Sequence, residues 1–344
     1  MILIYWQVTA ELPSNASGDL TPAVEINRAG SRCAGRPLEE EDLVVRHRSL
    51  FVLGAAVTAG SLLMSGCGVF DAERKTVSLR DRLPKAIRDA GVIQVGSDLN
   101  YAPVDFRDAN GVTIGMDPDI AEALGRVLGV KFEFHDTNGF NHVLPSLLQG
   151  KYDIAMSAIT DTRERRDGQD ADGRKVNEGV NFVDYFLAGI AIVVEKGNPK
   201  KIFGLNDLCG RTLAVKKSTT QYELAVRQQQ ACRNLGKPLK VTGQNSDVQA
   251  LAEVRAGRAD AQMSDFPVAA HSARTTDGGK AFELAPDQLQ PAPFGIALRK
   301  EDTELRDALV RAIDTIIISG EYEKILAKWN LTNGAVQNAL ATGS

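Results

Sequence analysis

Residues 115–136, GMDPDIAEALGRVLGVKFEFHD, contain a helix followed at once by a strand, and this order decides the fold class. Asp117 and Pro118 suit the N-cap and the first position of a helix, because proline has no N–H to lose there. Apolar residues then recur on one helical face: Ile120, Ala121, Leu124, Val127 and Leu128. Gly129 is a typical helix stop, and residues 131–135 favour a strand. This stretch is therefore one helix–strand unit of a chain in which helices and strands alternate.

The same alternation extends in both directions from this unit. Strands are predicted at residues 91–97, 152–157, 182–186, 190–196, 211–217, 239–243, 260–263 and 294–299, with a hairpin at 106–116 around Asn110-Gly111. Helices are predicted at residues 141–149, 219–234, 247–255, 302–319 and 321–329. Strands separated by helices at this spacing indicate parallel α/β sheets. We therefore expect two α/β units of about 100 residues each and a C-terminal helical segment.

The composition of the 344-residue chain is that of a globular protein, with 43% hydrophobic and 24% charged residues. The formal net charge is −4 and no basic block is present, so we expect no nucleic-acid partner. The four cysteines form no CxxC pair and there are only four histidines. We therefore expect neither a metal site nor a cofactor.

A basic and then apolar stretch near the N-terminus has the pattern of an export signal. Arg46-His47-Arg48 precede SLFVLGAAVTAGSLLM at residues 49–64, and Ser65-Gly66-Cys67 follow. The segment resembles a lipoprotein signal, which implies that Cys67 is the lipidated first residue of the mature protein. Met64 stands where that pattern prefers leucine. A transmembrane anchor is the other interpretation, although the apolar run is shorter than the roughly 20 residues that a spanning helix needs.

Residues 1–66 are thus predicted to be a leader region, and residues 67–75 a tether. Residues 1–45 are polar, rich in turn formers and without a hydrophobic period. A signal sequence normally starts at the initiator. We therefore expect translation to begin at Val44 or Val45, which would make residues 1–45 a start-site artefact.

Five motifs beyond residue 90 carry a family resemblance. They are DLNYAP at 98–103, GMDPDIA at 115–121, KYDI at 151–154, SAITDTRER at 157–165 and GRAD at 257–260. Together they resemble family 3 of the bacterial extracellular solute-binding proteins, the polar amino-acid receptors of ABC importers. The resemblance covers about residues 90–330.

The resemblance implies an α/β fold of the two-lobed periplasmic-binding-protein type II. Each lobe would be a sheet flanked by helices, and two hinge strands would join the lobes. Lobe 1 would comprise residues 76–189 plus 293–332, and lobe 2 residues 190–292. The tail, residues 333–344, is small and polar, and we expect it to be loose.

The resemblance also assigns roles to three residues of lobe 1. Arg165 would clamp the α-carboxylate of an amino acid, because a guanidinium offers two parallel donors to a carboxylate. Thr160 would add a hydroxyl, and Ala158 would offer its backbone carbonyl to the α-ammonium. An arginine at the start of a loop is otherwise usually a solvated charge. The flanking match at residues 157–162 is what favours the clamp.

Five further residues complete the implied ligand site. Thr220 would donate to the carboxylate near a helix N-terminus, a favourable place for an anion. Asp265 would pair with the α-ammonium, although its position after a strand also suits a helix N-cap. Tyr101 and Phe140 would sandwich the ligand side chain, or else be core aromatics. Asp98 would meet the polar end of that side chain.

Two departures from the family pattern lie beside Arg165. Residues 167–179, DGQDADGRKVNEG, are an insert that is polar and contains glycine, and hence a surface loop that could alter the rim of the cleft. The following strand, residues 182–186, lacks the family's proline.

Cys209 and Cys232 flank a strand and a helix of lobe 2. In an exported protein two such thiols are more often joined than free. A disulfide closing a loop of about 24 residues would stabilise the fold by roughly 3 kcal/mol. Two buried reduced thiols are the alternative.

We expect the protein to be a monomeric, extracytoplasmic membrane lipoprotein that closes its lobes around a free L-amino acid and delivers it to an importer permease. It would not be an enzyme. Because the carboxylate of Asp98 suits an amide or a cation, glutamine or a basic amino acid is favoured, with glutamate third. Two alternatives stay open: an exported dehydratase acting on arogenate or related cyclohexadienyl acids, and a soluble sensor for a membrane signalling protein.

Overall fold

The computed structural model describes residues 78–343, except residues 171 and 287. The predicted leader 1–66, its lipidation site Cys67 and the tether 67–75 lie outside the described residues. Within that described part, no helix is both long and apolar enough to cross a membrane.

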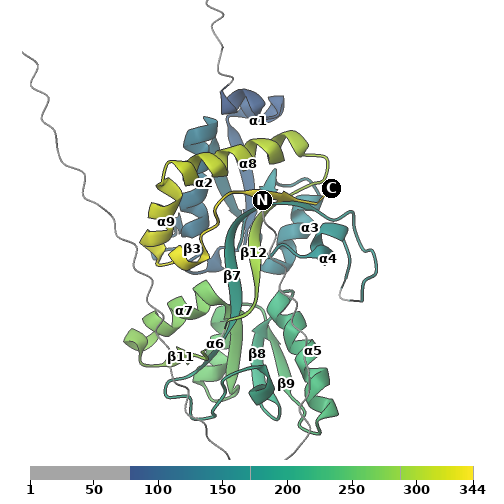
Figure 1. The fold of residues 1–344 in the computed structure, drawn as a ribbon, viewed down its shortest axis with the longest axis vertical. Helices are drawn as coiled ribbons and strands as arrows, with labels where there is room; N and C mark the ends of the chain where they lie inside the picture. Colours follow the sequence, from purple (N-terminus) through teal and green to yellow (C-terminus); the bar gives the residue numbers. More distant parts are fainter. Residues whose placement is uncertain (1–77, 171, 287, 344) are drawn as a thin grey trace, which may run out of the picture. The chain divides into compact units, whose positions relative to one another are not determined.

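Two long antiparallel strands, β7 (Asn181–Glu195) and β12 (Leu289–Leu298), connect two groups of strands (Figure 1). The order in the sheet is β5-β1-β6-β12-β7-β10-β8-β9. The sequence predicts two strands where the structure has β7 alone. They merge because Leu187 and Ala188 remain extended and continue to pair with β12.

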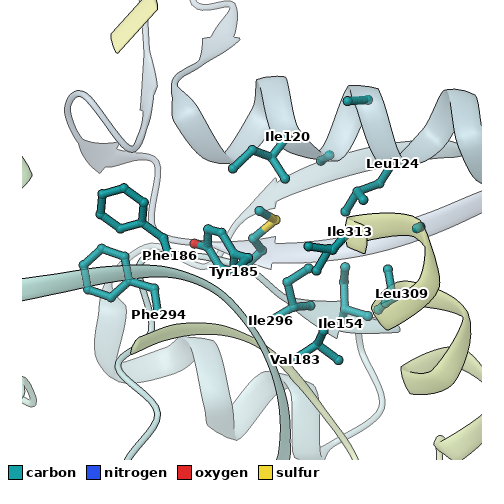
Figure 2. Close-up of a cluster of buried hydrophobic side chains, with 14 of the residues drawn as sticks. Ile120, Leu124, Ile154, Val183, Tyr185, Phe186, Phe294, Ile296, Leu309 and Ile313 are labelled. Atoms are coloured by element: carbon teal, nitrogen blue, oxygen red, sulfur yellow. The ribbon is translucent and has the colours of Figure 1, made fainter. Parts of the chain in front are cut away.

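We call the first group of strands and its helices the β1 half. Its strands β1 (Val92–Ser97), β5 (Lys131–Asp136) and β6 (Ile154–Ala155) are parallel. Its main helices are α1 (Lys85–Ala90), α2 (Met116–Leu128), α3 (Val143–Leu148), α8 (Thr303–Ile318) and α9 (Glu321–Trp329). Side chains from α2, α8 and the central strands interdigitate in one core, which includes Ile120, Tyr185, Phe294 and Ile313 (Figure 2).

Helix α2 shows why the sequence folds as it does and corrects one prediction. Gly129 ends the helix in the left-handed conformation with φ of 66°, as the pattern predicts. Asp117 is not the N-cap, however, because the helix begins at Met116 after Gly115. The Asp117 carboxylate is fully buried and accepts hydrogen bonds from Tyr185 Oη (2.6 Å) and Ala158 N (3.2 Å).

The second group of strands, with its helices, forms the β8 half. Strand β8 (Thr212–Lys216) lies between β9 (Lys240–Gln244) and β10 (Ala261–Asp265), parallel to both. Helix α5 (Thr220–Asn234) packs in one hydrophobic cluster, while α6 (Asp247–Arg255) and α7 (Phe266–Thr275) pack in another. The sheet of this half is thus covered on both faces, as expected for parallel strands.

The remaining elements are short. A three-stranded sheet contains β2 (Asn100–Tyr101), β3 (Asp105–Arg107) and β4 (Thr113–Ile114), which confirms the predicted hairpin around Gly111. The others are α4 (Arg163–Asp167), β11 (Phe282–Leu284), β13 (Leu340–Thr342) and the 3₁₀ turns Leu79–Arg82, Phe140–His142, Leu205–Leu208, Thr276–Gly279 and Thr332–Gly334.

The C-terminal tail is not loose, contrary to the prediction. Strand β13 pairs antiparallel with β7 through the contacts Leu340 to Asp184 and Thr342 to Phe182. Gly334 and Gly343 allow this close approach, because a Cβ at either position would collide with Phe186 or Asn181, whereas composition alone suggested disorder. The predicted disulfide between Cys209 and Cys232 is present, with 5.1 Å between the two Cα atoms.

Candidate functional site

Seven of the eight predicted ligand residues line one small pocket between the β1 half and the β8 half. They are Tyr101, Phe140, Ala158, Thr160, Arg165, Thr220 and Asp265. The remaining lining residues are Lys216, Thr219 and Gln221. The eighth predicted residue, Asp98, lies behind this lining, where its carboxylate accepts a hydrogen bond from Lys216.

Arg165 lies on α4, a single helical turn whose N-cap is Thr162. Its Nη1 donates to the carbonyl oxygen of Thr160 at 2.7 Å, and its guanidinium carbon lies 5.5 Å from the Phe140 ring centre. Withdrawal of the guanidinium from solvent lowers the pKa of Arg165, although the residue as a whole is only partly buried. Among the described residues no carboxylate is within ion-pair distance of this cation. The pocket therefore offers an unneutralised guanidinium to an anion.

Asp265 supplies the opposite charge from the end of β10. It occupies the N-cap position of α7 but makes no cap hydrogen bond. Its oxygens instead accept from Gln221 Nε2 and from Tyr101 Oη, each at 2.6 Å. Burial raises the pKa of Asp265 to about 7, even though the hydrogen bond from Tyr101 opposes the shift. The Tyr101 contact also joins the two halves across the pocket.

Lys216, which the sequence reasoning did not single out, fills the space between the two aromatic rings. Its Nζ lies 4.7 Å from the Tyr101 ring centre and 5.2 Å from that of Phe140. It donates to Asp98 Oδ2 at 2.6 Å. Burial alone would lower the pKa of Lys216, but the charges of Asp247 and Asp98 raise it. The residue is 4% exposed, so the pocket holds a fixed, paired ammonium.

From the sequence, only the position of Lys216 near the end of a predicted parallel strand draws attention to it; the face on which it lies is known from the structure. Along β8, Leu213 and Val215 pack in one hydrophobic cluster and Ala214 in the other, so Lys216 follows Ala214 on the second face. Lys216 is also the last residue of a parallel strand, and ligands of open α/β sheets bind beyond the carboxyl ends of the strands.

The N-terminus of α5 completes the pocket. Thr219, not Thr220, is the N-cap and accepts a hydrogen bond from Tyr222 N at 3.2 Å. Thr220 and Gln221, the first residues of the helix, line the pocket. Amide groups and the helix dipole at this position favour an anion.

The loop that carries Ala158 and Thr160 is held from the β1 half. Ala158 has a φ of 46°, which is uncommon for a residue with a side chain, and its N–H donates to the buried carboxylate of Asp117. Ser157 Oγ donates to Asp105 at 2.6 Å and accepts from Asp98 N at 3.0 Å. Asp117 and Asp105 thus fix the loop whose backbone faces the pocket.

A larger groove of about 480 Å³ opens beside the pocket, between β2, β3, α6 and α7. Its lining is mainly apolar, and its two arginines, Arg107 and Arg255, lie on exposed surface. Its lining contains one buried carboxylate, Asp247, but no buried cation, so it lacks the pair of opposite charges found in the small pocket.

Comparison with known proteins identifies the family. Residues 93–332 match the model of the bacterial extracellular solute-binding proteins, family 3. The chain belongs to this family. The arginine-binding protein ArgT of Corynebacterium glutamicum is 31% identical over 262 residues, which cover 75% of this chain and 80% of ArgT.

Solved structures agree with this assignment. An ancestral amino acid-binding protein, AncCDT-1, described as a precursor of cyclohexadienyl dehydratase, is 34% identical with a TM-score of 0.60 over 71% of this chain and 97% of that one. An ancestral arginine-binding protein bound to glutamine is 32% identical with a TM-score of 0.58 over 70% and 98%. The family 3 chain described here therefore has the expected type II periplasmic-binding-protein fold.

Proposed function

We propose that this family 3 protein captures a free polar L-amino acid outside the cytoplasm and presents it to the permease of an ABC importer. Residues 76–189 plus 293–332 would move as one lobe and residues 190–292 as the other, with β7 and β12 as the hinge. The observation that carries the proposal is the presence of Arg165 and Asp265, of opposite charge and from opposite halves, in one pocket.

The backbone groups of an amino acid fit these two charges. Its α-carboxylate would bind Arg165, with Thr160 and the N-terminus of α5 near Thr220 as further donors. Its α-ammonium would bind Asp265 and the carbonyl oxygen of Ala158. Because the ligand contacts both halves only when they are together, its binding free energy favours closure.

The side-chain end of the pocket favours glutamine over a basic amino acid. Asp98 is already paired with Lys216, so a cationic side chain would meet the Lys216 ammonium and repel it. The oxygen of a glutamine amide can accept from Lys216 while its NH₂ group donates to Asp98. Glutamate would be attracted by Lys216 but repelled by Asp98.

The mature protein would start at Cys67, carry a lipid there and act as a monomer at the outer face of the membrane. This part rests on the basic, apolar and small-residue pattern of residues 46–67. Mass spectrometry of the native protein tests it, since the N-terminal peptide should begin at Cys67 and carry acyl chains.

Isothermal titration of residues 67–344 with the twenty amino acids tests the binding function. We expect glutamine to bind most tightly, arginine and lysine more weakly, and glutamate weakest of these polar candidates. Tighter binding of arginine than of glutamine would contradict the side-chain assignment alone. No amino-acid binding, together with turnover of arogenate or prephenate, would favour the dehydratase alternative instead.

A further inference from the structure

The C-terminal strand β13 pairs with β7, and its last residue, Thr342, donates a hydrogen bond to Asp161 in the segment that carries Arg165. We define residues 160–166 as the carboxylate arm. We propose that β13 braces this arm through the contacts of Thr342 with Asp161 and of Asp161 with Arg166, and so sets the affinity for the α-carboxylate. The inference rests on the proposed amino-acid binding.

The contacts converge on Asp161, in the middle of the arm. Its side chain is 0% exposed and accepts from Arg166 Nη1 at 2.6 Å and from the hydroxyl of Thr342. Its backbone N–H donates to the carbonyl oxygen of Pro293 at 2.9 Å. A buried carboxylate depends on its hydrogen-bond donors, so removal of one donor shifts or destabilises the group.

A shift of Asp161 would displace Arg165, because both neighbours of Asp161 hold Arg165 in place. Its neighbour Thr160 accepts the hydrogen bond of Arg165 Nη1, and its other neighbour Thr162 caps the helical turn on which Arg165 lies. Displacements well below 1 Å at a charged contact weaken binding, because hydrogen bonds depend steeply on distance and angle. Thr342 is therefore a positioning residue that does not touch the ligand.

Several contacts indicate that the tail is built to dock at this place. Glycine is required at position 343, where φ is 89° and a Cβ would collide with Asn181. A Cβ at Gly334 would likewise collide with the Phe186 ring. Ala339 N donates to Asp314 Oδ1 at 2.9 Å. Contacts on both sides of Thr342 thus fix the tail.

A different role would be simple protection of the sheet edge, since β13 covers one side of β7. Protection needs only the backbone ladder. The hydroxyl of Thr342 adds a contact that the backbone pairing of β13 with β7 does not need, because it reaches Asp161 in the carboxylate arm. Replacing that hydroxyl by a methyl group therefore separates the two roles, because Val pairs equally well in a strand.

The test compares Thr342→Val with Thr315→Val in residues 67–344. Thr315 is a matched control whose exposed hydroxyl donates only to Arg311 O within α8 (2.7 Å). The probes are L-glutamine and L-glutaminamide, which lacks the carboxylate. For Thr342→Val we expect about a three- to tenfold loss of glutamine affinity and less than about a twofold change for glutaminamide. Thr315→Val should change neither affinity.

Three outcomes would overturn the proposal. Unchanged glutamine affinity in Thr342→Val would show that the contact with Asp161 does not position the clamp. Equal losses for both probes would assign to β13 a general role in folding. If the unchanged protein bound neither glutamine nor any other amino acid, the proposed function would fail and the brace with it.

Discussion

Lys216 Nζ lies 2.6 Å from Asp98 Oδ2, and this buried ion pair joins the β8 half to the β1 half at the side-chain end of the pocket. A second carboxylate, Asp247, lies 3.8 Å from the same ammonium. Desolvation of two buried charges offsets much of their attraction, so such a pair contributes little net stability. Its value here would lie in selectivity, because Lys216 lines the pocket and a ligand amide that reaches Lys216 would also approach Asp98.

Replacement of Lys216 by methionine should move the preference from glutamine toward arginine. Methionine keeps the apolar stem but removes the ammonium, which leaves Asp98 and Asp247 free to accept a cationic side chain. We expect glutamine affinity to fall about tenfold and arginine affinity to rise by a similar factor, as measured by calorimetry.

Lys217→Met is the matched control for this substitution. Lys217 is exposed and contacts Asn245 Oδ1 at 3.4 Å, outside the pocket. Lys217→Met should leave the affinities for glutamine and for arginine unchanged. An unaltered ratio of the glutamine and arginine affinities in Lys216→Met would count against the proposed selectivity.

Arg165→Lys should abolish most binding although it keeps the positive charge. An ammonium cannot form two parallel hydrogen bonds to a carboxylate, and it would not reach the carbonyl oxygen of Thr160 in the same geometry. We expect at least about a 100-fold loss in affinity for every amino acid tested. The surface substitution Arg163→Lys, on the same helical turn, should have no effect, since Arg163 is 81% exposed and pairs with Asp167. Comparable losses in both variants would argue against the clamp.

The affinity for the amino acid should fall as the pH is lowered below 7. Burial raises the pKa of Asp265 to about 7 in the free protein, and an α-ammonium would favour the ionised form. Below pH 7 the proton competes with the ligand, so the affinity should drop by at most about tenfold per pH unit. Calorimetry in buffers of different ionisation enthalpy should detect proton release on binding at pH 6. A pH-independent affinity between pH 5 and about 7 would contradict the role of Asp265.

Asp184→Asn should stabilise the protein at alkaline pH and have little effect in acid. Burial and the neighbouring charge of Asp161 raise the pKa of Asp184 to about 7. Because the unfolded carboxyl titrates at about pH 4, the folded state loses stability from this group as the pH rises from about 4 to about 7, and no more above that. The unchanged protein should therefore lose at most about 1.4 kcal/mol of unfolding free energy per pH unit from this group, and the variant should not. Urea unfolding at several pH values measures the difference; parallel pH profiles for the two proteins would refute it.

The alternation of helices and strands in the sequence predicts the α/β class, because a parallel sheet must be covered by helices on its faces. Gly129 ends α2 and Asn110-Gly111 turns the hairpin, as local conformational preferences require. Asp117 was misplaced, since an acidic residue at a helix start usually caps it. Its carboxylate instead holds Ala158 from a distance of 41 residues in sequence, and local patterns carry no information on such a contact.

The same limit applies to Lys216 and to the tail. A lysine at the end of a strand is usually solvated, and only the approach of Asp98 and Asp247 from other segments makes this one buried. The small residues after Asn333 have the composition of a disordered end. Pairing with β7 is a tertiary contact that composition does not reveal.

A crystal structure of residues 67–344 grown with L-glutamine tests the central claim most directly. In that structure the α-carboxylate should lie on Arg165, the α-ammonium on Asp265 and the side-chain amide against Lys216, close to Asp98. Glutamine bound elsewhere, such as in the apolar groove beside α6 and α7, without contact to Arg165 and Asp265, would rule out the proposed site.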